Sequence, residues 1–545
     1  MRRMIGVGVG LLFATLAVLL WKQSQVSVAA DQIAPGDAVF YFEVPQLVTT
    51  IKNLPDTALY QIFQEPSVRR FVKQPGSLIS KEYEGVWNSF LNLDCTALFF
   101  CATDPNRQRW IVGFQGSSSS PARSREIQNI SKRLFGRGAV HISLVETGKV
   151  RFTDDADGIC FAEIGAWTVL SRNSVLLRES LRNAKSGDAG LRSSKLFQEC
   201  RSNIRAPYDL LLFARGSPSL NLGSGAAWEF DREQTPSSAQ AVMASTTIEG
   251  ARLRDTIFTL TGTSQRYEPL SRQGLTMTSA KTIGYLASRL ELSHLWRLSD
   301  QFSGDWPVAA ALRDYISETR SFGIDPQDLD QLVTAAEIVI DQDPASGSLV
   351  TAILLEITDL PRFQQLVDRI VREKLPDSCR PTSIAGLPAY ILSPNENASV
   401  VFGLVDHRLL ITWDESVFVE MVQRLRAKDR GLEHNDQFKE TEGLVAAPSD
   451  LFLYIDAKVG FQRLYDASRP MLIFGAALIP AVNRFVDVMA LPEGVEIAKH
   501  LSPIVLSRHR VANGFIDESA GPVTAYEASA FAVGSAVAVG LLQRK

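Results

Sequence analysis

Short apolar runs recur along the chain between Pro, Gly, Asp and Asn residues, the pattern typical of β-strands joined by turns. In the first half, strands are predicted over residues 38–44, 96–102, 110–115, 150–153, 159–163, 167–171, 210–215, 244–251 and 253–262. In the second half, they are predicted over residues 337–341, 349–356, 389–392, 400–405, 408–412, 451–456, 505–510 and 511–516. The chain is therefore expected to contain extensive β-sheet.

Helices are predicted where apolar residues recur three and four positions apart. The predicted ranges are 47–53, 57–64, 65–72, 81–92, 124–135, 174–184, a short piece near 197, 360–374, 415–427 and part of 459–484. Asn173 and Asp414 are the expected N-caps of the helices that follow them, because a short polar side chain can accept from the free N–H groups of a first turn. Residues 216–240, rich in Ser, Gly and Pro, are predicted to form a loop.

The chain repeats one stretch of its own sequence. Residues 159–214 and 400–455 align without a gap, and each matching pair is separated by 241 positions. The pairs are Phe161/Phe402, Glu179/Glu420, Asp188/Asp429, Gly190/Gly431, Leu191/Leu432, Phe197/Phe438, Glu199/Glu440, Pro207/Pro448, Asp209/Asp450, Leu210/Leu451 and Leu212/Leu453. Chance matches would not keep one spacing, so an internal duplication is predicted.

The order of these elements predicts an α+β fold. We expect two similar halves from an internal duplication, each a mixed, mainly antiparallel sheet with helices packed on one face. A chain of 545 residues is too long for one hydrophobic core, which also favours two domains. The first α+β repeat is expected over residues 31–270 and the second over residues 271–525.

Residues 1–30 have the composition of a targeting segment. Arg2 and Arg3 precede an apolar run over residues 5–20, and Val28-Ala29-Ala30 is a small-residue cleavage site. The apolar run also reaches the lower limit for a bilayer span. Two interpretations stay open, a signal peptide cleaved near Ala30 and an uncleaved inner-membrane anchor. Both place the rest of the chain outside the cytoplasm, in the periplasm or beyond.

The end of the chain, residues 526–545, forms an apolar C-terminal tail. Residues 528–542 carry no charge and consist mainly of small side chains, and Arg544 and Lys545 follow them. Fifteen residues is short for a bilayer span. The tail is interpreted as a helix docked on the protein, with a membrane-touching or sorting segment as the alternative.

Composition and charge exclude some classes of partner. The chain is 45% hydrophobic with a formal net charge of −4, so no basic field is available for phosphates and nucleic acid is not expected as a partner. Five cysteines, an odd number without a C-x-x-C spacing, do not match a zinc ribbon or a thioredoxin motif. Cys95 and Cys101 are expected to pack as small apolar side chains, because six residues of extended strand would hold them too far apart for a disulfide.

Candidate chemistry is scarce in the sequence. Asp154, Asp155 and Asp157 ahead of Gly158 suggest the start of a calcium loop, but no glutamate closes it, so a hairpin turn is predicted. No two histidines lie four positions apart, as a zinc-protease helix requires. No nucleophile elbow or Walker loop is present. No catalytic, cofactor-binding or metal-ligating residue is therefore predicted.

The repeated residues allow a functional and a structural interpretation. Asp209 and Asp450 each precede an apolar strand and could form a pair of carboxylates, but a hydrogen bond to local backbone is favoured. Gly190 and Gly431 are predicted to occupy turns with positive φ. The aromatic run 40–42 is predicted to lie in the sheet core rather than to form a ligand platform.

The opening of the exported part carries a resemblance. Pro35-Gly36-Asp37, Tyr41 and Val44-Pro45 are followed by Thr57-Ala58-Leu59 and Glu65-Pro66-Ser67-Val68. This spacing resembles the opening of a family of exported bacterial proteins catalogued only as a domain of unknown function. The resemblance implies a signal-bearing α+β protein with two similar halves and no assigned catalytic residues.

The sequence therefore predicts an exported, envelope-associated protein without catalytic activity that acts as a binding or structural module. The expected partners are the membrane, through the N-terminal segment, and an envelope protein or an apolar ligand. Two alternatives stay open: an exported hydrolase whose site is assembled from distant residues, and a carrier of an apolar ligand.

Overall fold

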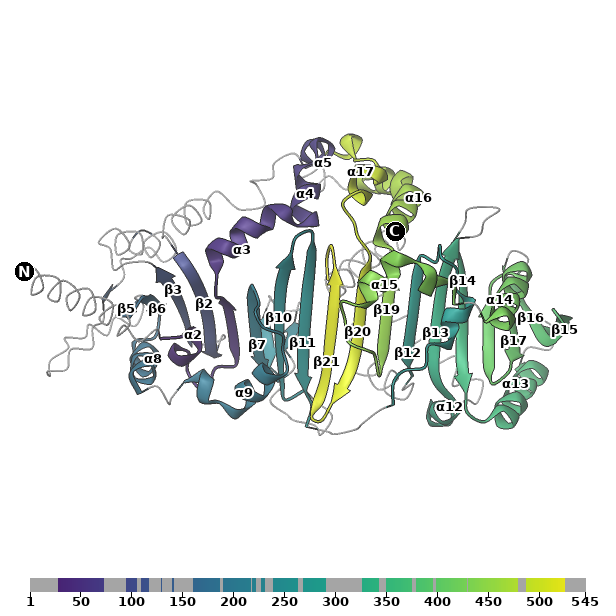
Figure 1. The fold of residues 1–545 in the computed structure, drawn as a ribbon, viewed down its shortest axis with the longest axis horizontal. Coiled ribbons are helices and arrows are strands. Elements are labelled where there is room, and N and C mark those ends of the chain that lie inside the picture. The colour runs from purple at the N-terminus through teal and green to yellow at the C-terminus, as the bar shows by residue number, and fades with distance from the viewer. Residues whose placement is uncertain are drawn as a thin grey trace, which may run out of the picture. The chain divides into compact units, whose positions relative to one another are not determined.

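The structure is a computed structural model (Figure 1). It describes residues 28–72, 95–104, 109–116, 129, 140–141, 160–186, 190–216, 218–221, 227–230, 239–262, 268–290, 326–342, 349–374, 379–395, 398–428, 430–478 and 487–524. Several predictions lie outside these residues: the helix over 81–92, nearly all of the helix over 124–135, the strand over 150–153, the turn at 154–158, most of the targeting segment and the C-terminal tail.

The chain divides into two compact units. The first consists of Met1–Leu54, Gly76–Thr247 and Ile257–Thr263, and the second of Pro55–Pro75, Ile248–Thr256 and Ser264–Lys545. The first unit ends at Thr263 and the chain then stays in the second unit from Ser264 on, close to the predicted boundary after residue 270. Two short pieces from the first half of the chain, residues 55–75 and 248–256, belong to the second unit, which the sequence did not predict.

The first unit is built on an antiparallel sheet. Its strands, in spatial order, are β5 (Cys160–Ile164), β6 (Trp167–Ser171), β3 (Arg109–Gly116), β2 (Cys95–Asp104), β1 (Phe40–Val44), β7 (Leu210–Arg215) and β10 (Ala241–Glu249). A short strand, β4 (Val140–His141), pairs with β5 in parallel. Strand β11 (Arg252–Leu260) follows β10 along the chain, and both strands are divided between the two units, because residues 248–256 belong to the second.

The second unit is also built on an antiparallel sheet. Its strands, in spatial order, are β15 (Cys379–Ile384), β16 (Leu387–Asn395), β17 (Ala398–Val405), β18 (Arg408–Thr412), β14 (Leu349–Ile357), β13 (Val333–Gln342), β12 (Gly284–Arg289), β19 (Leu451–Ile455), β20 (Ile504–Val511) and β21 (Gly514–Gly521). The predicted α+β class with mainly antiparallel sheets is confirmed.

The two sheets follow the same order of pairing. In the first, Tyr41 on β1 lies between Cys101 and Phe213. In the second, Tyr285 on β12 lies between Val339 and Tyr454. Phe213 and Tyr454 are separated by the 241 positions found in the sequence repeat. That both units descend from one duplicated segment stays a prediction.

Each unit has a capped helix at the equivalent place. Helix α8 (Ser174–Ser186) packs on β5, β6 and β3, and α14 (Glu415–Ala427) packs on β17, β18 and β14. Asn173 Oδ1 accepts from the N–H of Leu176 at 2.9 Å, and Asp414 Oδ1 accepts from the N–H of Ser416 at 2.7 Å. Both predicted N-caps are confirmed, because each side chain satisfies a donor that the helix leaves free.

Helix α13 (Leu360–Lys374), with the predicted bounds, adds a second cover to the sheet of the second unit. Phe363 packs with Leu409 and Phe402, whereas Phe418 of α14 packs with Leu410 and Val401. Neighbouring residues of a strand point to opposite faces. The strands β17 and β18 are therefore apolar on both faces, and a helix covers each face.

Two local predictions were wrong. Residues 216–240 do not form an open loop throughout, because β8 (Pro218–Asn221) pairs with β9 (Ala227–Phe230) in an antiparallel hairpin. The turn between the last two strands lies at Ala512 and Asn513, after Val511 rather than before it.

The start of the described chain is packed into the first unit. The indole N–H of Trp167 donates to the carbonyl oxygen of Val28 at 2.8 Å. Ala30 and Ile33 of the short helix α2 (Ala30–Ile33) are fully buried. Within the residues that the structure describes, none of the helices combines the length and apolar composition needed to span a bilayer.

Candidate functional site

Each of the two repeated aspartates bonds a side chain within its own unit. Asp209 Oδ1 accepts from the hydroxyl of Thr50 at 3.1 Å in the first unit. Asp450 Oδ2 accepts from Nε of Arg510 at 2.5 Å in the second unit. These contacts give each carboxylate a structural partner inside its own unit. The predicted hydrogen bond from each carboxylate to local backbone stays a prediction.

The two repeated glycines, Gly190 and Gly431, each lie directly against another backbone segment, but they do not share a positive φ. Gly190 has φ +127°, as predicted, but Gly431 is not among the residues with positive φ. A Cβ on Gly190 would lie 2.6 Å from the carbonyl oxygen of Gln32, and one on Gly431 would lie 2.6 Å from that of Thr278. Each glycine is required because another backbone segment passes directly against it.

The aromatic run of the first strand is only partly core. Tyr41 is fully buried, with its ring centroid 6.2 Å from that of Phe99 and 5.8 Å from that of Phe197. Phe40 and Phe42 are half-buried. The prediction of a core role is confirmed for Tyr41, whose side chain lies on the face that Phe197 covers.

The cysteines and histidines do not assemble a reactive centre in the part of the chain that the structure describes. All five cysteines are free thiols, four of them buried, and Cys95 is half-buried. Burial raises the pKa of Cys160 to about 11 and that of Cys200 to about 12, which keeps both as inert thiols. No three His, Cys, Asp or Glu side chains of the described residues are grouped closely enough to hold a metal ion.

A buried tyrosine bonds a glutamate in each unit. The hydroxyl of Tyr41 donates to Glu43 Oε2 at 3.0 Å. The hydroxyl of Tyr285 donates to Glu337 Oε2, which also accepts from the N–H of Gly274 at 2.8 Å. Burial raises the pKa of both carboxyls, and the hydrogen bond from the tyrosine offsets part of that rise.

The two glutamates occupy exchanged positions. Glu43 lies on β1 opposite Phe99 of β2, whereas Glu337 lies on β13 opposite Ala287 of β12. The tyrosine thus has an acidic partner in both units, on its own strand in the first and on the neighbouring strand in the second. The sequence offered one signal, an acid inside an apolar strand. Because Glu337 is 6% exposed, the geometry indicates a polar contact inside the core rather than a site open to a substrate.

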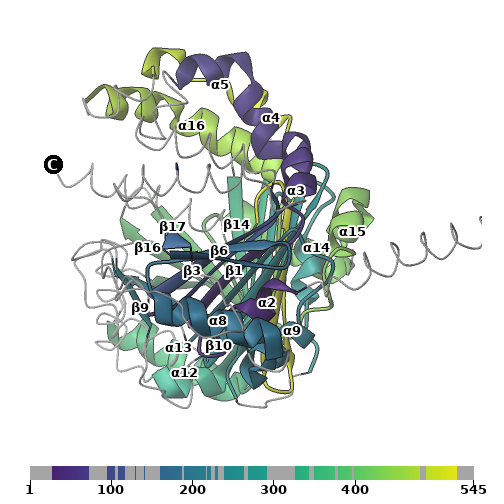
Figure 2. The ribbon, with the colours of Figure 1, turned by 90° about the vertical axis from the view of Figure 1, so that its left-hand side faces the viewer.

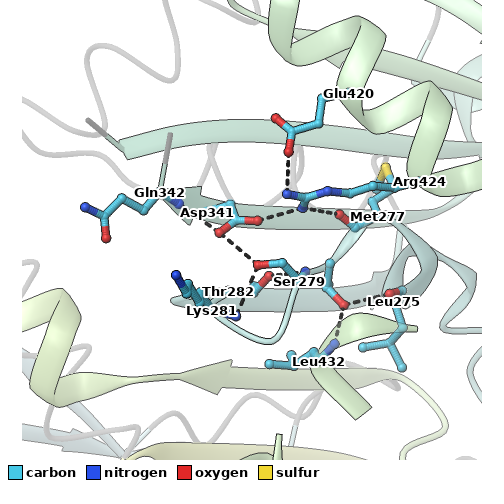
Figure 3. Close-up of polar contacts among 11 residues, drawn as sticks. Leu275, Met277, Ser279, Lys281, Thr282, Asp341, Gln342, Glu420, Arg424 and Leu432 are labelled. Atoms are coloured by element: carbon cyan, nitrogen blue, oxygen red, sulfur yellow. Dashed lines mark hydrogen bonds and ion pairs between the residues drawn. The ribbon is translucent and has the colours of Figure 1, made fainter. Parts of the chain in front are cut away.

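A hollow of about 430 Å³ lies beside α14 in the second unit, next to the polar contacts of Arg424 that Figure 3 draws. Its lining residues are Thr278, Ser279, Ala280, Gln423, Arg424, Ala427, Gly431 and His434. Arg424 donates to Asp341 Oδ2 at 2.7 Å, to Glu420 Oε1 at 2.6 Å and to the carbonyl of Met277 at 2.8 Å.

These bonds give Arg424 a structural role. Asp341 also accepts from the hydroxyl of Ser279 at 3.3 Å, so the arginine and the aspartate hold the loop after η5 (Gln273–Met277) against α14. Two carboxylates already balance the one guanidinium charge, which disfavours an anionic ligand. The hollow is therefore a weak candidate for a binding site.

The strongest candidate is a group of helices in the second unit, which we call the helical layer. It consists of α4 (Ala58–Gln64), α5 (Pro66–Phe71), α16 (Ala457–Leu478), η8 (Val488–Ala490) and α17 (Gly494–Ala498). Contacts link α4 to α5, α5 to η8, and α16 to both η8 and α17. Figures 1 and 2 show α4, α5 and α16 gathered beyond the end of the strands.

Polar bonds join the two chain segments of the layer. Glu65 Oε1 lies 2.6 Å from Nε2 of His500 and 2.8 Å from Nζ of Lys499. These hydrogen bonds from Lys499 and His500 lower the pKa of Glu65. The N–H of Asp487 donates to the carbonyl of Phe71 at 2.6 Å. Residues 55–72 are thus held to residues 487–500, although more than 400 positions separate them in sequence.

Large apolar side chains of the helical layer face solvent. Phe63 is 57% exposed, Leu464 is 68% exposed and Met489 is 87% exposed, and Leu59, Tyr60 and Val495 are also exposed. Scattered exposed apolar residues are ordinary, but six on one group of helices make this layer the strongest candidate for an interaction surface. In the first unit, Val48, Ile51 and Leu54 are exposed at a spacing of three along α3 (Leu47–Asn53) and the residue after it.

The charges of the layer balance. Residues 55–72, 457–478 and 487–500 contain six Lys or Arg and six Asp or Glu. A surface of this kind favours an apolar partner over a charged one. Sequence reasoning missed it, because residues spaced as Leu59 and Phe63 are also the pattern of a helix that faces the core.

Comparisons with known proteins add little. No protein-family model matches the chain, and no curated protein matches it. Among solved structures, crystal form III of a protein named TP0453 matches with a TM-score of 0.23 and 13% identity, over 46% of this chain and 78% of that one. Crystal form I of TP0453 matches with a TM-score of 0.24 and 12% identity, over 44% and 82%. A likeness of this size supports no conclusion about fold or function.

Proposed function

We propose that this protein is an exported, envelope-anchored binding module without catalytic activity, and that the helical layer of its second unit contacts an apolar partner. The observation that carries the proposal is the exposure of six large apolar side chains on that layer. The buried Tyr–Glu pairs and the bonds of Arg424 support a structural role for the polar clusters elsewhere.

The packing of residues 28–33 supports an uncleaved anchor. Cleavage after Ala30 would remove the Val28 carbonyl that Trp167 binds, and it would place a charged N-terminus next to the buried Ile33. A charge brought into an apolar site is costly. We therefore propose that residues 1–27 remain attached and hold the chain at the inner membrane.

The prediction is that the protein purified from envelope membranes keeps peptides from before residue 30. Mass spectrometry of its N-terminal peptides measures this directly. Trp167→Phe, which removes the donor but keeps an aromatic ring, is the control for the packing and should leave the N-terminus unchanged. An N-terminus at Asp31 in the native protein would contradict retention of the anchor.

The contact surface is tested by photo-crosslinking in cells. Benzoylphenylalanine at Phe63 or at Met489 is expected to give adducts with another envelope component, because both side chains project from the helical layer. Trp413, 51% exposed in the same unit but outside the layer, is the matched control position and should give none. Equal adducts at all three positions, or none at any, would overturn the proposed surface.

A further inference from the structure

We propose that the C-terminal tail of this same chain, residues 526–545, docks on the helical layer and covers its exposed apolar side chains until a partner displaces it. The inference rests on the proposed function in one respect: displacement of the tail would expose the helical layer to its apolar partner. The docking itself rests on where the described chain ends, on the composition of the tail and on the uncovered surface beside that end.

The tail leaves the second unit next to the helical layer. Thr524 is the last residue that the structure describes, and Val523 precedes it. Val523 packs on a cluster that contains Ala457 and Leu501. Ala457 is the first residue of α16, and Leu501 lies three residues after the end of α17. Thr524 is 2% exposed, so this attachment point is fixed. The described chain therefore ends beside residues that adjoin two helices of the layer, α16 and α17.

The distances allow the docking. Only residues 525–527 separate Thr524 from the apolar run over 528–542. Four extended steps reach about 14 Å, and Leu464 lies about 10 Å along α16 from Ala457. Fifteen residues in a helix would extend about 22 Å, enough to pass along much of α16.

The chemistry of the two surfaces matches. Residues 528–542 carry no charge, and Val533, Val537 and Leu541 recur every fourth position, which would form one stripe on a helix. The layer carries balanced charges and exposes Phe63, Leu464 and Met489. Burial of both surfaces against each other removes apolar area from water. The short tether raises the effective concentration of the tail to about the millimolar range, above that of a free partner.

Met489 provides a reporter that needs no new side chain. Its thioether is exposed and oxidises to the sulfoxide with peroxide, and mass spectrometry of its peptide measures the rate. The experiment uses the full chain in the detergent-free cell fraction that contains it, and compares it with a chain that ends at Thr524. We expect oxidation of Met489 to be at least fivefold faster without the tail. Met243, fully buried in the first unit, should oxidise slowly in both chains.

A charged substitution within the tail distinguishes loss of docking from other effects of deleting the tail. Val537→Asp in the full chain is expected to raise the Met489 rate to that of the shortened chain. Gln543→Asp introduces the same charge outside the apolar run and should leave the rate unchanged. An unchanged rate after removal of the tail would overturn the proposal. Protection that appears only at high protein concentration would assign a second copy instead, and protection only with added phosphatidylcholine vesicles would assign a membrane surface.

The partner adducts at Phe63 distinguish this inference from the proposed function. If both hold, the adducts increase severalfold when the tail is removed. If the tail protects Met489 but no adduct forms in either chain, the docking stands and the proposed partner surface fails. If adducts form equally with and without the tail and Met489 is unprotected, the partner surface stands and the docking fails.

Discussion

Replacing Glu337 by alanine is expected to destabilise the second unit by about 3 kcal/mol near pH 4.5. The hydroxyl of Tyr285 and the N–H of Gly274 both donate to Glu337 Oε2, and both donors would be left buried without an acceptor. Each such donor costs about 1–3 kcal/mol, and the cavity left by the side chain adds to this. Chemical unfolding followed by hydrogen exchange of the paired strands β12 and β13 measures the loss.

Glu337→Gln is the matched control, because its amide oxygen can accept from both donors without carrying a charge. It also gives a pH dependence with a defined sign. Burial raises the pKa of Glu337 above its ordinary 4.5, so the stability that this group contributes is full below pH 4.5 and is lost as the pH rises through the raised value. The native chain should therefore lose stability relative to Glu337→Gln as the pH rises from 4.5 towards 7.5. Parallel curves for the two proteins would contradict this.

Replacing Gly190 by alanine is expected to destabilise the first unit by about 4 kcal/mol. Its φ of +127° and ψ of −177° lie in a region that is nearly restricted to glycine, which costs about 1–3 kcal/mol for another residue. The new Cβ would also lie 2.6 Å from the carbonyl oxygen of Gln32, and overpacking of this kind costs about 1–3 kcal/mol. The shift in unfolding midpoint, with hydrogen exchange of β1 and β7, measures the effect.

Two other glycines separate the two causes. Gly165 has φ +58° with no atom within 4 Å of a new Cβ, so Gly165→Ala should cost about 1 kcal/mol from the backbone alone. Gly431 lacks a positive φ but meets the carbonyl oxygen of Thr278 at 2.6 Å, so Gly431→Ala should cost about 2 kcal/mol from the contact alone. If Gly190→Ala lowers the free energy of unfolding no more than Gly165→Ala does, the close contact with Gln32 contributes nothing to the loss of stability.

Local features of the fold were predictable from the sequence. The N-caps Asn173 and Asp414 and the bounds of α13 follow from side-chain chemistry and spacing over a few residues. The constant spacing of 241 also placed Phe213 and Tyr454 at equivalent points of two sheets. These features are local or repeated, so the pattern of apolar and polar positions records them directly.

The candidate site could not be predicted in the same way. The spacing of Leu59 and Phe63 is that of an amphipathic helix, and the same spacing serves a buried face and an exposed one. The bonds of Glu65 to His500 and Lys499, together with the bond from the N–H of Asp487 to the carbonyl of Phe71, show that residues 55–72 join a segment more than 400 positions away.

The sequence by itself determined the alternation that makes the strands, the capped helices and the register of the repeat. These depend on φ/ψ preferences and on side-chain spacing within one element. Only the tertiary structure decided which acid bonds Tyr285, which backbone passes against Gly431, and which apolar helix faces remain uncovered. Each of these depends on contacts between segments far apart in the chain, and a short-range pattern is the same whether or not such a contact forms.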